Sequence, residues 1–284
     1  MKVLIVGGTS ALALVLCPAL ATIADDIMTA GRRGGDIELD LTWPAAKFAL
    51  PPGLDVVIQL ASHFGGQDMD SMLAAEEVNA LGLLKLCHAC ATAGVGHLVQ
   101  ISSIFAGLPA DSPFCNSYAL SKRHGEDMAR LYCNSARFPL TVLRPGQFYG
   151  EGDGFRRHQP FLYAIMDRAQ RGERIVLFGK NDALRNLIHV EDVVEIIVRV
   201  VRQRVLGQFD CASLVNVRYS EIAAAAIAAF GSASEIRFDP EKPDIPDNSF
   251  PANDSLYRLI GYFPQINLAQ GLAREAARRI KGDV

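Results

Sequence analysis

The first half of the chain alternates short apolar runs with longer stretches in which apolar residues recur at helical spacing. The apolar runs predict buried strands at residues 2–6, 27–30, 36–41, 55–60, 97–101 and 140–143. Helices are expected between them, above all at residues 11–20, 73–93 and 118–135. Strands that alternate with helices predict a doubly wound, mostly parallel α/β sheet, whose ligands bind beyond the carboxyl ends of the strands.

The pattern changes at Glu151, where a loop rich in glycine and charged residues begins. A short strand is expected at residues 174–178, and helices at residues 160–171, up to about 201, 220–230 and 268–280. We therefore expect two domains. Residues 1–150 are expected to form the first domain, which also receives roughly residues 187–214. Residues 151–284 form a smaller, partly discontinuous lobe, with the substrate in a cleft between the two.

Composition and charge exclude several classes of protein. Half of the 284 residues are hydrophobic, 21% are charged and the net charge is −3, with acids and bases mixed along the chain. This is typical of a globular protein, and the sequence has no basic tract that would bind nucleic acid. Cys87-x-x-Cys90 lies in an apolar helical stretch without a second pair, so we expect core residues and no metal site.

The N-terminal residues imitate a secretory signal, because an apolar run precedes Pro18-Ala19-Leu20-Ala21. Cleavage after Ala21 would, however, remove the first predicted strand. We therefore expect the segment to be structural and the protein to be cytoplasmic. No other apolar run reaches the roughly 18 residues that a membrane span needs, so no membrane association is expected.

A Gly-rich turn, Gly7-Gly8-Thr9-Ser10-Ala11-Leu12-Ala13, joins the first strand to the first helix. Strand, turn and helix in this order are the setting of a dinucleotide fingerprint, in which phosphate lies at the helix N-terminus. Ser10 and Ala13 stand where the fingerprint has glycines, and the hydroxyl of Ser10 can bond a phosphate oxygen instead. The local pattern is equally compatible with a strand-turn-helix that binds nothing.

The second strand is followed by Gly31-Arg32-Arg33-Gly34 rather than by an acidic residue. A carboxylate at this place holds the ribose 2′-hydroxyl of NAD, whereas guanidinium groups suit the 2′-phosphate of NADP. Arg32 and Arg33 therefore favour NADP(H), with NAD(H) as the alternative. The other interpretation is a solvated basic turn.

Tyr118 and Lys122 lie four residues apart, on one face of a predicted helix. An ammonium near a phenol favours the phenolate, so we expect the pKa of Tyr118 to fall towards neutral pH. Such a tyrosine can exchange a proton with a carbonyl or alcohol oxygen while a nicotinamide carries hydride. Tyr-x-x-x-Lys alone is common on ordinary helices, so the assignment depends on the other motifs.

These landmarks occur in one order with others along nearly the whole chain. The further pieces are Asp55–Ser62, Asn79, Ile101-Ser102-Ser103, Arg144-Pro145 through Tyr149-Gly150, Arg185 through Asp192, and Leu259-x-Gly261-Tyr262-x-Pro264. Together they resemble the extended short-chain dehydrogenase/reductase family, in its nucleotide-sugar epimerase, dehydratase and ketoreductase group. The resemblance implies a Rossmann-type fold, in which residues 1–150 are the dinucleotide-binding domain, with a smaller, mostly C-terminal α/β substrate lobe.

The resemblance also implies roles for individual residues. Tyr118 would be the acid/base, Lys122 would lower its pKa and hold the nicotinamide ribose, and Ser103 would hydrogen-bond the reacting substrate oxygen. Neighbouring Ser102 is the alternative to Ser103. The residues expected to line the cofactor are Gly7, Thr9, Ser10, Ala11, Leu12, Arg32, Arg33, Asp40, Leu41, Leu60, Ala61, Ser62, Asn79, Tyr118, Lys122, Pro145 and Gly146.

The implied substrate is a nucleotide-activated sugar, with Gln147 at the sugar and Arg185 at the diphosphate, although an arginine is more often part of a surface salt bridge. Ile104-Phe105 stand where dehydratases of the group carry an Asp-Glu pair, so elimination of water is not expected. What remains is an NAD(P)-dependent 4-epimerase or 4-keto-sugar reductase. A reductase of a non-sugar carbonyl and a non-catalytic NADP-binding sensor stay open as alternatives.

Family members often pair through two helices, which correspond here to residues 79–93 and 117–132. Both stretches carry enough apolar residues for such pairing. The resemblance therefore implies a homodimer.

Overall fold

A computed structural model describes residues 1–282; residues 283 and 284, the end of the predicted C-terminal lobe, lie outside the described residues. The chain divides into two compact units. Unit 1 consists of Met1–Pro145 and Val194–Cys211. Unit 2 consists of Gly146–Val193 and of the described chain from Ala212 onward.

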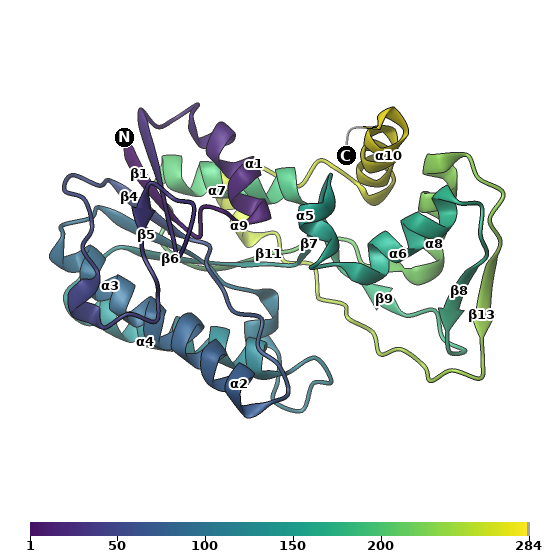
Figure 1. Ribbon diagram of the computed structural model, residues 1–284, viewed down its shortest axis with the longest axis horizontal. Helices are drawn as coiled ribbons and strands as arrows, with labels where there is room; N and C mark the ends of the chain where they lie inside the picture. Colours follow the sequence, from purple (N-terminus) through teal and green to yellow (C-terminus); the bar gives the residue numbers. More distant parts are fainter. Residues whose placement is uncertain (283–284) are drawn as a thin grey trace. The chain divides into compact units, whose positions relative to one another are not determined.

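Unit 1 is built on a seven-stranded sheet in which all neighbouring strands are parallel (Figure 1). In spatial order its strands are β11 (Gly207–Cys211), β6 (Leu140–Pro145), β5 (His97–Ile101), β4 (Val56–Gln59), β1 (Lys2–Val6), β2 (Asp26–Gly31) and β3 (Ile37–Glu38). The order reverses between β1 and β4, the point at which doubly wound sheets bind ligands. The predicted doubly wound parallel sheet is confirmed.

Helices cover both faces of this sheet (Figure 1). One face carries α1 (Ala11–Leu20) and α7 (Val190–Gln203), and the other carries α2 (Met69–Glu76), α3 (Gly82–Thr92) and α4 (Ser117–Ala136). Single 3-10 turns lie at Ala45–Lys47 and Ile104–Gly107. Leu4, Val57 and Leu98 of the sheet pack in one core with Leu86 of α3 and Ala129 of α4, which fixes α4 on the sheet.

Two elements differ from the sequence-based expectation. The helix expected at residues 73–93 begins at Met69 and contains a π-helical turn at Glu77–Leu81. The strand expected at residues 36–41 is reduced to Ile37–Glu38. The physical reason is a turn at Asp40, whose carboxylate accepts hydrogen bonds from the backbone N–H and the hydroxyl of Thr42, both at 2.9 Å.

Unit 2 contains three small two-stranded sheets. β7 (Gln147–Tyr149) pairs with β10 (Leu187–His189), β8 (Ile175–Phe178) with β13 (Ile236–Asp239), and β9 (Leu184–Arg185) with β12 (Val217–Arg218). Its helices are α5 (Asp153–Arg156), α6 (Pro160–Gln170), α8 (Tyr219–Phe230), α9 (Ser255–Ile260) and α10 (Leu268–Lys281). Tyr163 and Tyr257 are its largest fully buried side chains.

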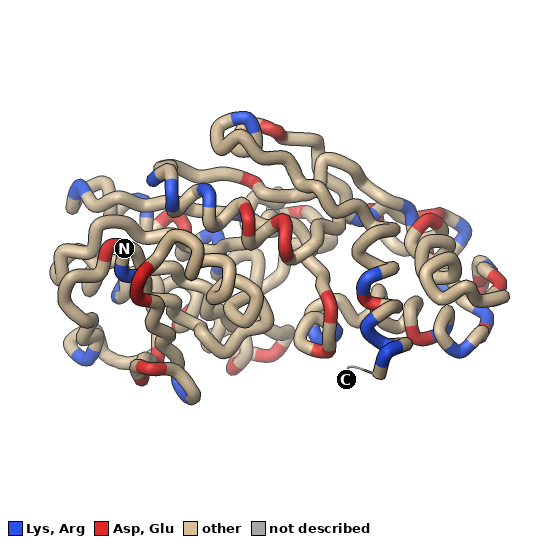
Figure 2. The backbone as a smooth tube through the Cα atoms, turned by 90° about the horizontal axis from the view of Figure 1, so that it is seen from above, with Lys and Arg blue, Asp and Glu red and all other residues tan. Residues whose placement is uncertain are grey.

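Charged residues of both signs are interspersed along the chain in each unit (Figure 2). Many exposed ones pair with each other, as Arg171 does with Glu173. Among residues 1–282, no helix combines the length and the apolar character that a bilayer crossing requires.

Candidate active site

Tyr118 and Lys122 lie in the first two turns of α4, which Asn116 caps by accepting a hydrogen bond from the backbone N–H of Ala119 at 3.0 Å. The two side chains share one helix face, with Lys122 Nζ 6.0 Å from the centroid of the Tyr118 ring. Lys122 is only 2% exposed, and its ammonium donates to the carbonyl of Ile101 at 3.0 Å. The pair therefore stands at the carboxyl end of β5.

Two serines reach the Tyr118 hydroxyl from neighbouring strand ends. Ser62 follows β4 and Ser103 follows β5, and the hydroxyls of both lie close enough to the Tyr118 phenol to influence its pKa. Ser102 points elsewhere, because its hydroxyl donates to the carboxylate of Glu126. The structure thus brings Ser103, and not Ser102, to the tyrosine, and it adds Ser62, for which only a place beside the cofactor was expected.

The protonation of the pair differs from the sequence-based expectation. Burial raises the pKa of Tyr118 above its ordinary value, and the nearby hydroxyls of Ser103 and Ser62 offset only part of that rise. The expected fall of this pKa is therefore wrong for the structure as it stands. Burial also lowers the pKa of Lys122 to about 8, against the opposing charge of Glu126. Near neutral pH the pair is a neutral phenol beside an ammonium, which suits proton donation.

Asn79 lies in the π-helical turn and links three elements. Its side-chain amide donates to the carbonyl of His63 at 2.7 Å and to the hydroxyl of Ser121 at 2.9 Å, and its oxygen accepts from the backbone N–H of His63 at 3.0 Å. A Cβ at Gly125 of α4 would lie 2.2 Å from the Asn79 carbonyl oxygen, so only glycine permits this approach. π turns are frequent at functional sites. Sequence reasoning missed this turn, because the hydrogen-bond partners of Asn79 lie in other elements.

The Gly-rich turn meets the end of β4. Gly7 has φ +92°, and a Cβ there would lie 2.6 Å from the backbone nitrogen of Ala61, so a side chain is excluded on both grounds. Ser10 caps α1 by accepting a hydrogen bond from the Ala13 N–H at 3.2 Å. Its hydroxyl proton can still be donated. This leaves a cradle of backbone groups at a helix N-terminus, which fits a dinucleotide phosphate.

The turn Gly31-Arg32-Arg33-Gly34 exposes both arginine side chains. It is closed by Asp36, whose carboxylate accepts from the backbone N–H and the hydroxyl of Thr29 at 2.7 and 2.8 Å. A Cβ at the second glycine of the turn would lie 3.4 Å from the Thr9 methyl group. The two arginines are therefore held beside the Gly-rich turn.

The remaining predicted cofactor residues are less available. Leu12, Leu41 and Leu60 are buried core residues, so only their backbone can meet a ligand. The carboxylate of Asp40 is engaged in its own turn. Pro145 is buried at the end of β6.

Gln147 and Arg185 share neighbours in unit 2. Asn248 donates its side-chain amide to Gln147 at 3.1 Å and its backbone N–H to the carbonyl next to Arg185 at 2.9 Å. Arg185 is only 5% exposed, donates to the Pro246 carbonyl at 3.0 Å and lies 4.6 Å above the Tyr219 ring. A surface salt bridge is therefore excluded for Arg185. Asn248 carried no sequence signal.

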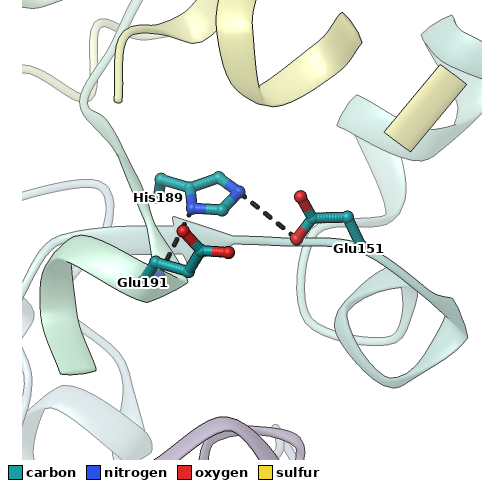
Figure 3. Close-up of side chains that lie close together, drawn as sticks. All are labelled: Glu151, His189 and Glu191. Carbon is teal, nitrogen blue, oxygen red and sulfur yellow. Dashed lines mark hydrogen bonds and ion pairs between the residues drawn. The ribbon is translucent and has the colours of Figure 1, made fainter. Parts of the chain in front are cut away.

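One cluster in unit 2 has the composition of a metal site. Figure 3 shows the side chain of His189 between those of Glu151 and Glu191. His189 Nδ1 accepts the backbone N–H of Glu191 at 3.3 Å, which leaves the ring proton on Nε2, 3.5 Å from Glu151. Glu191 is paired with Arg274 at 2.7 Å. A protonated nitrogen and a neighbouring guanidinium both disfavour a bound cation, so we interpret the cluster as a set of structural polar contacts.

The sequence matches the profile of the NAD dependent epimerase/dehydratase family over residues 3–211. The chain belongs to this family. Its relatives include a dTDP-4-dehydro-6-deoxy-D-allose reductase from a Streptomyces species, with 28% identity over 68% of this chain and 65% of that protein, so the chain spans just under two thirds of that relative. A UDP-glucose 4-epimerase of Mycolicibacterium smegmatis is 26% identical over 84% of this chain and 79% of that protein.

Solved structures of similar fold agree with this membership. The structure of MoeE5 in complex with UDP-glucose and NAD superposes with a TM-score of 0.81 at 20% identity, covering all of both chains. At this identity the likeness shows the fold of the family in this chain.

Proposed function

We propose that this family member is an NAD(P)-dependent oxidoreductase that acts on a nucleotide-activated sugar by hydride transfer at a sugar carbon, as a 4-keto-sugar reductase or a 4-epimerase. The observation that supports the proposal is that Tyr118, Ser103 and Lys122 lie together at the carboxyl end of β5. The names of the two relatives, a keto-sugar reductase and a sugar 4-epimerase, support the same chemistry.

The residues have distinct tasks in this reaction. A bound nicotinamide supplies or accepts the hydride. Tyr118 donates its proton to the carbonyl oxygen of the substrate in reduction and takes it back in oxidation. Ser103 hydrogen-bonds the same oxygen, and the ammonium of Lys122 stabilises the phenolate that remains. Gly7, Ser10 and the N-terminus of α1 hold the phosphates of the dinucleotide.

Replacing the reacting hydroxyl tests the proposal directly. We expect Tyr118→Phe to lower kcat by about 10² to 10⁴-fold, the usual contribution of a general acid, while the dissociation constant of the dinucleotide stays the same. Tyr132→Phe removes a hydroxyl from the same helix, where it hydrogen-bonds His88, and is the matched control. Turnover of Tyr118→Phe at the level of this control would refute the assigned role.

The favoured cofactor is NADP(H). The hydrogen bonds between Thr29 and Asp36 close the turn that carries the exposed Arg32 and Arg33, and this turn lies beside the Gly-rich turn. Removing both, as Arg32→Ala with Arg33→Ala, should weaken NADPH binding by about 10 to 100-fold and leave NADH binding unchanged. Arg237→Ala, at an exposed arginine of unit 2, is the control. Tighter binding of NADH than of NADPH by the unmodified protein would contradict the preference.

Arg185 separates the sugar substrate from a non-sugar carbonyl. A guanidinium bound to a diphosphate contributes to ground-state binding, so Arg185→Ala should raise KM by about 10-fold or more with little change in kcat. Unchanged KM would favour a reductase of a non-sugar carbonyl. Absence of turnover with every keto-sugar tested would favour a non-catalytic sensor.

Assembly as a homodimer rests on an apolar surface of unit 1. Leu73 of α2, Leu81 of the π turn and Leu131 of α4 are 60, 49 and 68% exposed, and a hydrogen bond of 2.9 Å between Glu76 and His124 shows that α2 and α4 are neighbours. Burying this surface in a second copy removes apolar area from water. Leu131→Asp should give a monomer by light scattering, whereas Leu259→Asp, 55% exposed in unit 2, should not.

The place of the first strand supports our proposal that residues 1–21 are not a cleaved secretory signal and that the protein is cytoplasmic. β1 pairs with both β2 and β4 in the middle of the sheet, so removal of the segment before Thr22 would dismantle unit 1. A mature protein that begins near Thr22 would contradict this location.

A further inference from the structure

Glu126 is a buried acid on the helix face that carries the acid/base pair. It lies one turn beyond Lys122 and two turns beyond Tyr118 in α4. Its side chain is 1% exposed, and the carboxylate accepts the Nε–H of Arg144 at 2.9 and 3.1 Å, a further guanidinium N–H, and the hydroxyl of Ser102. Every bond of this carboxylate therefore ties α4 to the ends of β5 and β6.

The partners of Glu126 place it behind the reacting groups. Ser102 is the residue before Ser103, so its bond to Glu126 holds the chain that presents Ser103 to Tyr118. Arg144, near the end of β6, fills the space between Glu126 and the 3-10 turn after Ser103, where a Cβ at residue 107 would lie 3.1 Å from its guanidinium. The network thus holds Ser103 in place through Ser102, and it holds α4 against β6 through Arg144.

The charge of Glu126 also acts on Lys122. Within residues 1–282 no carboxylate forms an ion pair with Lys122, whose ammonium is buried and donates to the Ile101 carbonyl. The groups that face it are Tyr118 and Glu126 on α4, with Arg144 on β6 behind Glu126. Burial lowers the pKa of Lys122 to about 8, and the carboxylate of Glu126 is the charge that opposes this decrease.

We infer that Glu126 is a positioning residue for the proposed reaction: it locks the Ser102-Ser103 strand end against α4 and keeps Lys122 in its ammonium form at the working pH. The inference rests on the acid/base role proposed for Tyr118 and Lys122. A buried ion pair is not needed for stability alone, because apolar residues of similar volume often serve equally well. The anion is required here because a buried ammonium has no other acid beside it among the described residues.

The pH profile of kcat tests the inference. Glu126→Gln keeps the shape of the side chain and removes its negative charge, so the pKa of Lys122 should fall. The alkaline limb of the profile of kcat against pH should then move to lower pH by about one unit. In Arg144→Met the carboxylate loses its compensating cation, so the same limb should move to higher pH. Opposite shifts in the two variants are the expected result.

Glu275→Gln is the matched control. Glu275 of unit 2 is also a buried carboxylate that accepts bonds from two arginines, Arg278 and Arg279, but no lysine stands beside it in α10 before Lys281. Its replacement should cost stability and leave the pH profile unmoved. If Glu126→Gln behaves in the same way as this control, Glu126 is structural and the inference is overturned.

Failure of the inference is separable from failure of the proposed function. Normal turnover by Tyr118→Phe would remove the acid/base role itself, whatever Glu126 does. An inactive Tyr118→Phe together with unshifted limbs in Glu126→Gln and Arg144→Met would remove only the inference. If Glu126→Gln does not fold, Arg144→Met decides alone: a limb that stays or moves to lower pH overturns the inference.

Discussion

Lys122 and His97 in unit 1 and Glu275 in unit 2 are buried ionisable groups whose surroundings differ. In unit 1, burial lowers the pKa of Lys122 to about 8, and burial with the charge of Arg204 lowers the pKa of His97 to about 4. In unit 2, burial tends to raise the pKa of Glu275, but hydrogen bonds from Arg278 and Arg279 hold it below its ordinary range.

A second buried acid of unit 2 is also held by several hydrogen bonds. Asp192, fully buried at the start of α7, accepts hydrogen bonds from the Tyr262 hydroxyl at 2.6 Å and from the backbone N–H groups of Gln265 and Ile266 at 2.8 and 3.1 Å. Glu275 and Asp192 thus hold together segments that are distant in sequence.

This difference distinguishes a buried group that is proposed to act in the reaction from a buried group that stabilises the fold. A buried base that makes no direct ion pair makes the folded state less stable than it could be, and proteins keep such groups mainly where a reaction needs them. A buried acid with all its acceptors occupied stabilises a fixed arrangement and has nothing left to exchange. Lys122 belongs to the first kind and Glu275 to the second.

The sharpest test of this contrast is Lys122→Met. We expect kcat to fall by about 10² to 10⁴-fold while the free energy of unfolding stays the same or rises. The gain should be largest below pH 8, where Lys122 is charged in both the folded and the unfolded state and the full cost of burying the ammonium applies. Kinetics and urea unfolding measure the two effects.

Lys47→Met, at an exposed lysine of unit 1, is the control for Lys122→Met and should change neither quantity. A loss of stability in Lys122→Met that parallels its loss of activity would mean that the lysine is structural.

The corresponding test in unit 2 is Glu275→Ala. It removes the buried partner of Arg279, which is 7% exposed and keeps its pair with Asp167 at 2.9 Å, so the free energy of unfolding should fall by about 3 kcal/mol. Glu235→Ala breaks an exposed pair with Arg174 and should cost less than about 1 kcal/mol. Equal effects of the two substitutions in denaturant titrations would contradict the view that burial makes the Glu275 pair structural.

His97 sharpens the contrast through pH. Its pKa is about 4 in the folded protein and near 6.5 when unfolded, so the unfolded state binds the extra proton between these values and stability falls as the pH is lowered from 6.5 to 4. The loss reaches at most about 3 kcal/mol. His97→Gln can keep the bond to Thr141 and should be less sensitive to acid, whereas exposed His124→Gln should behave like the unmodified protein. Identical pH dependence in all three would count against this account.

The smallest effect is expected at the Glu151, His189 and Glu191 cluster. His189→Gln should lower the free energy of unfolding by about 1 kcal/mol, through loss of its hydrogen bonds, and should leave kcat unchanged. A chelator should have no effect on activity. Stoichiometric metal in the purified protein that disappears with His189→Gln would show that the cluster is a cation site after all.

Much of the fold was predictable because its signals are local. The apolar runs at β1 and β5 and the helical spacing of α4 lie within single elements, and their order along the chain predicts the doubly wound sheet. The π turn was not predictable, because it depends on Asn79 bonding to His63 and Ser121 from other elements. β3 was overestimated because a side-chain bond within the Asp40 turn competes with the sheet.

The candidate site shows the same division. The spacing of Tyr118 and Lys122 was sufficient to put them on one helix face, and the order of motifs was sufficient to identify the family. Which serine meets the tyrosine depended on Glu126, which takes Ser102 and leaves Ser103. The direction of the Tyr118 pKa depended on burial, which no spacing reveals.

By itself, the sequence determined the alternation of elements, the Gly-rich turn and the residue types of the proposed acid/base pair, since these follow from backbone geometry and from side chains a few residues apart. Only the tertiary structure decided how far Lys122 is desolvated, which acid stabilises its charge and which buried polar groups have hydrogen-bond partners. Desolvation and hydrogen-bond partners come from residues that are far apart in the chain, and they exist only once the elements have packed.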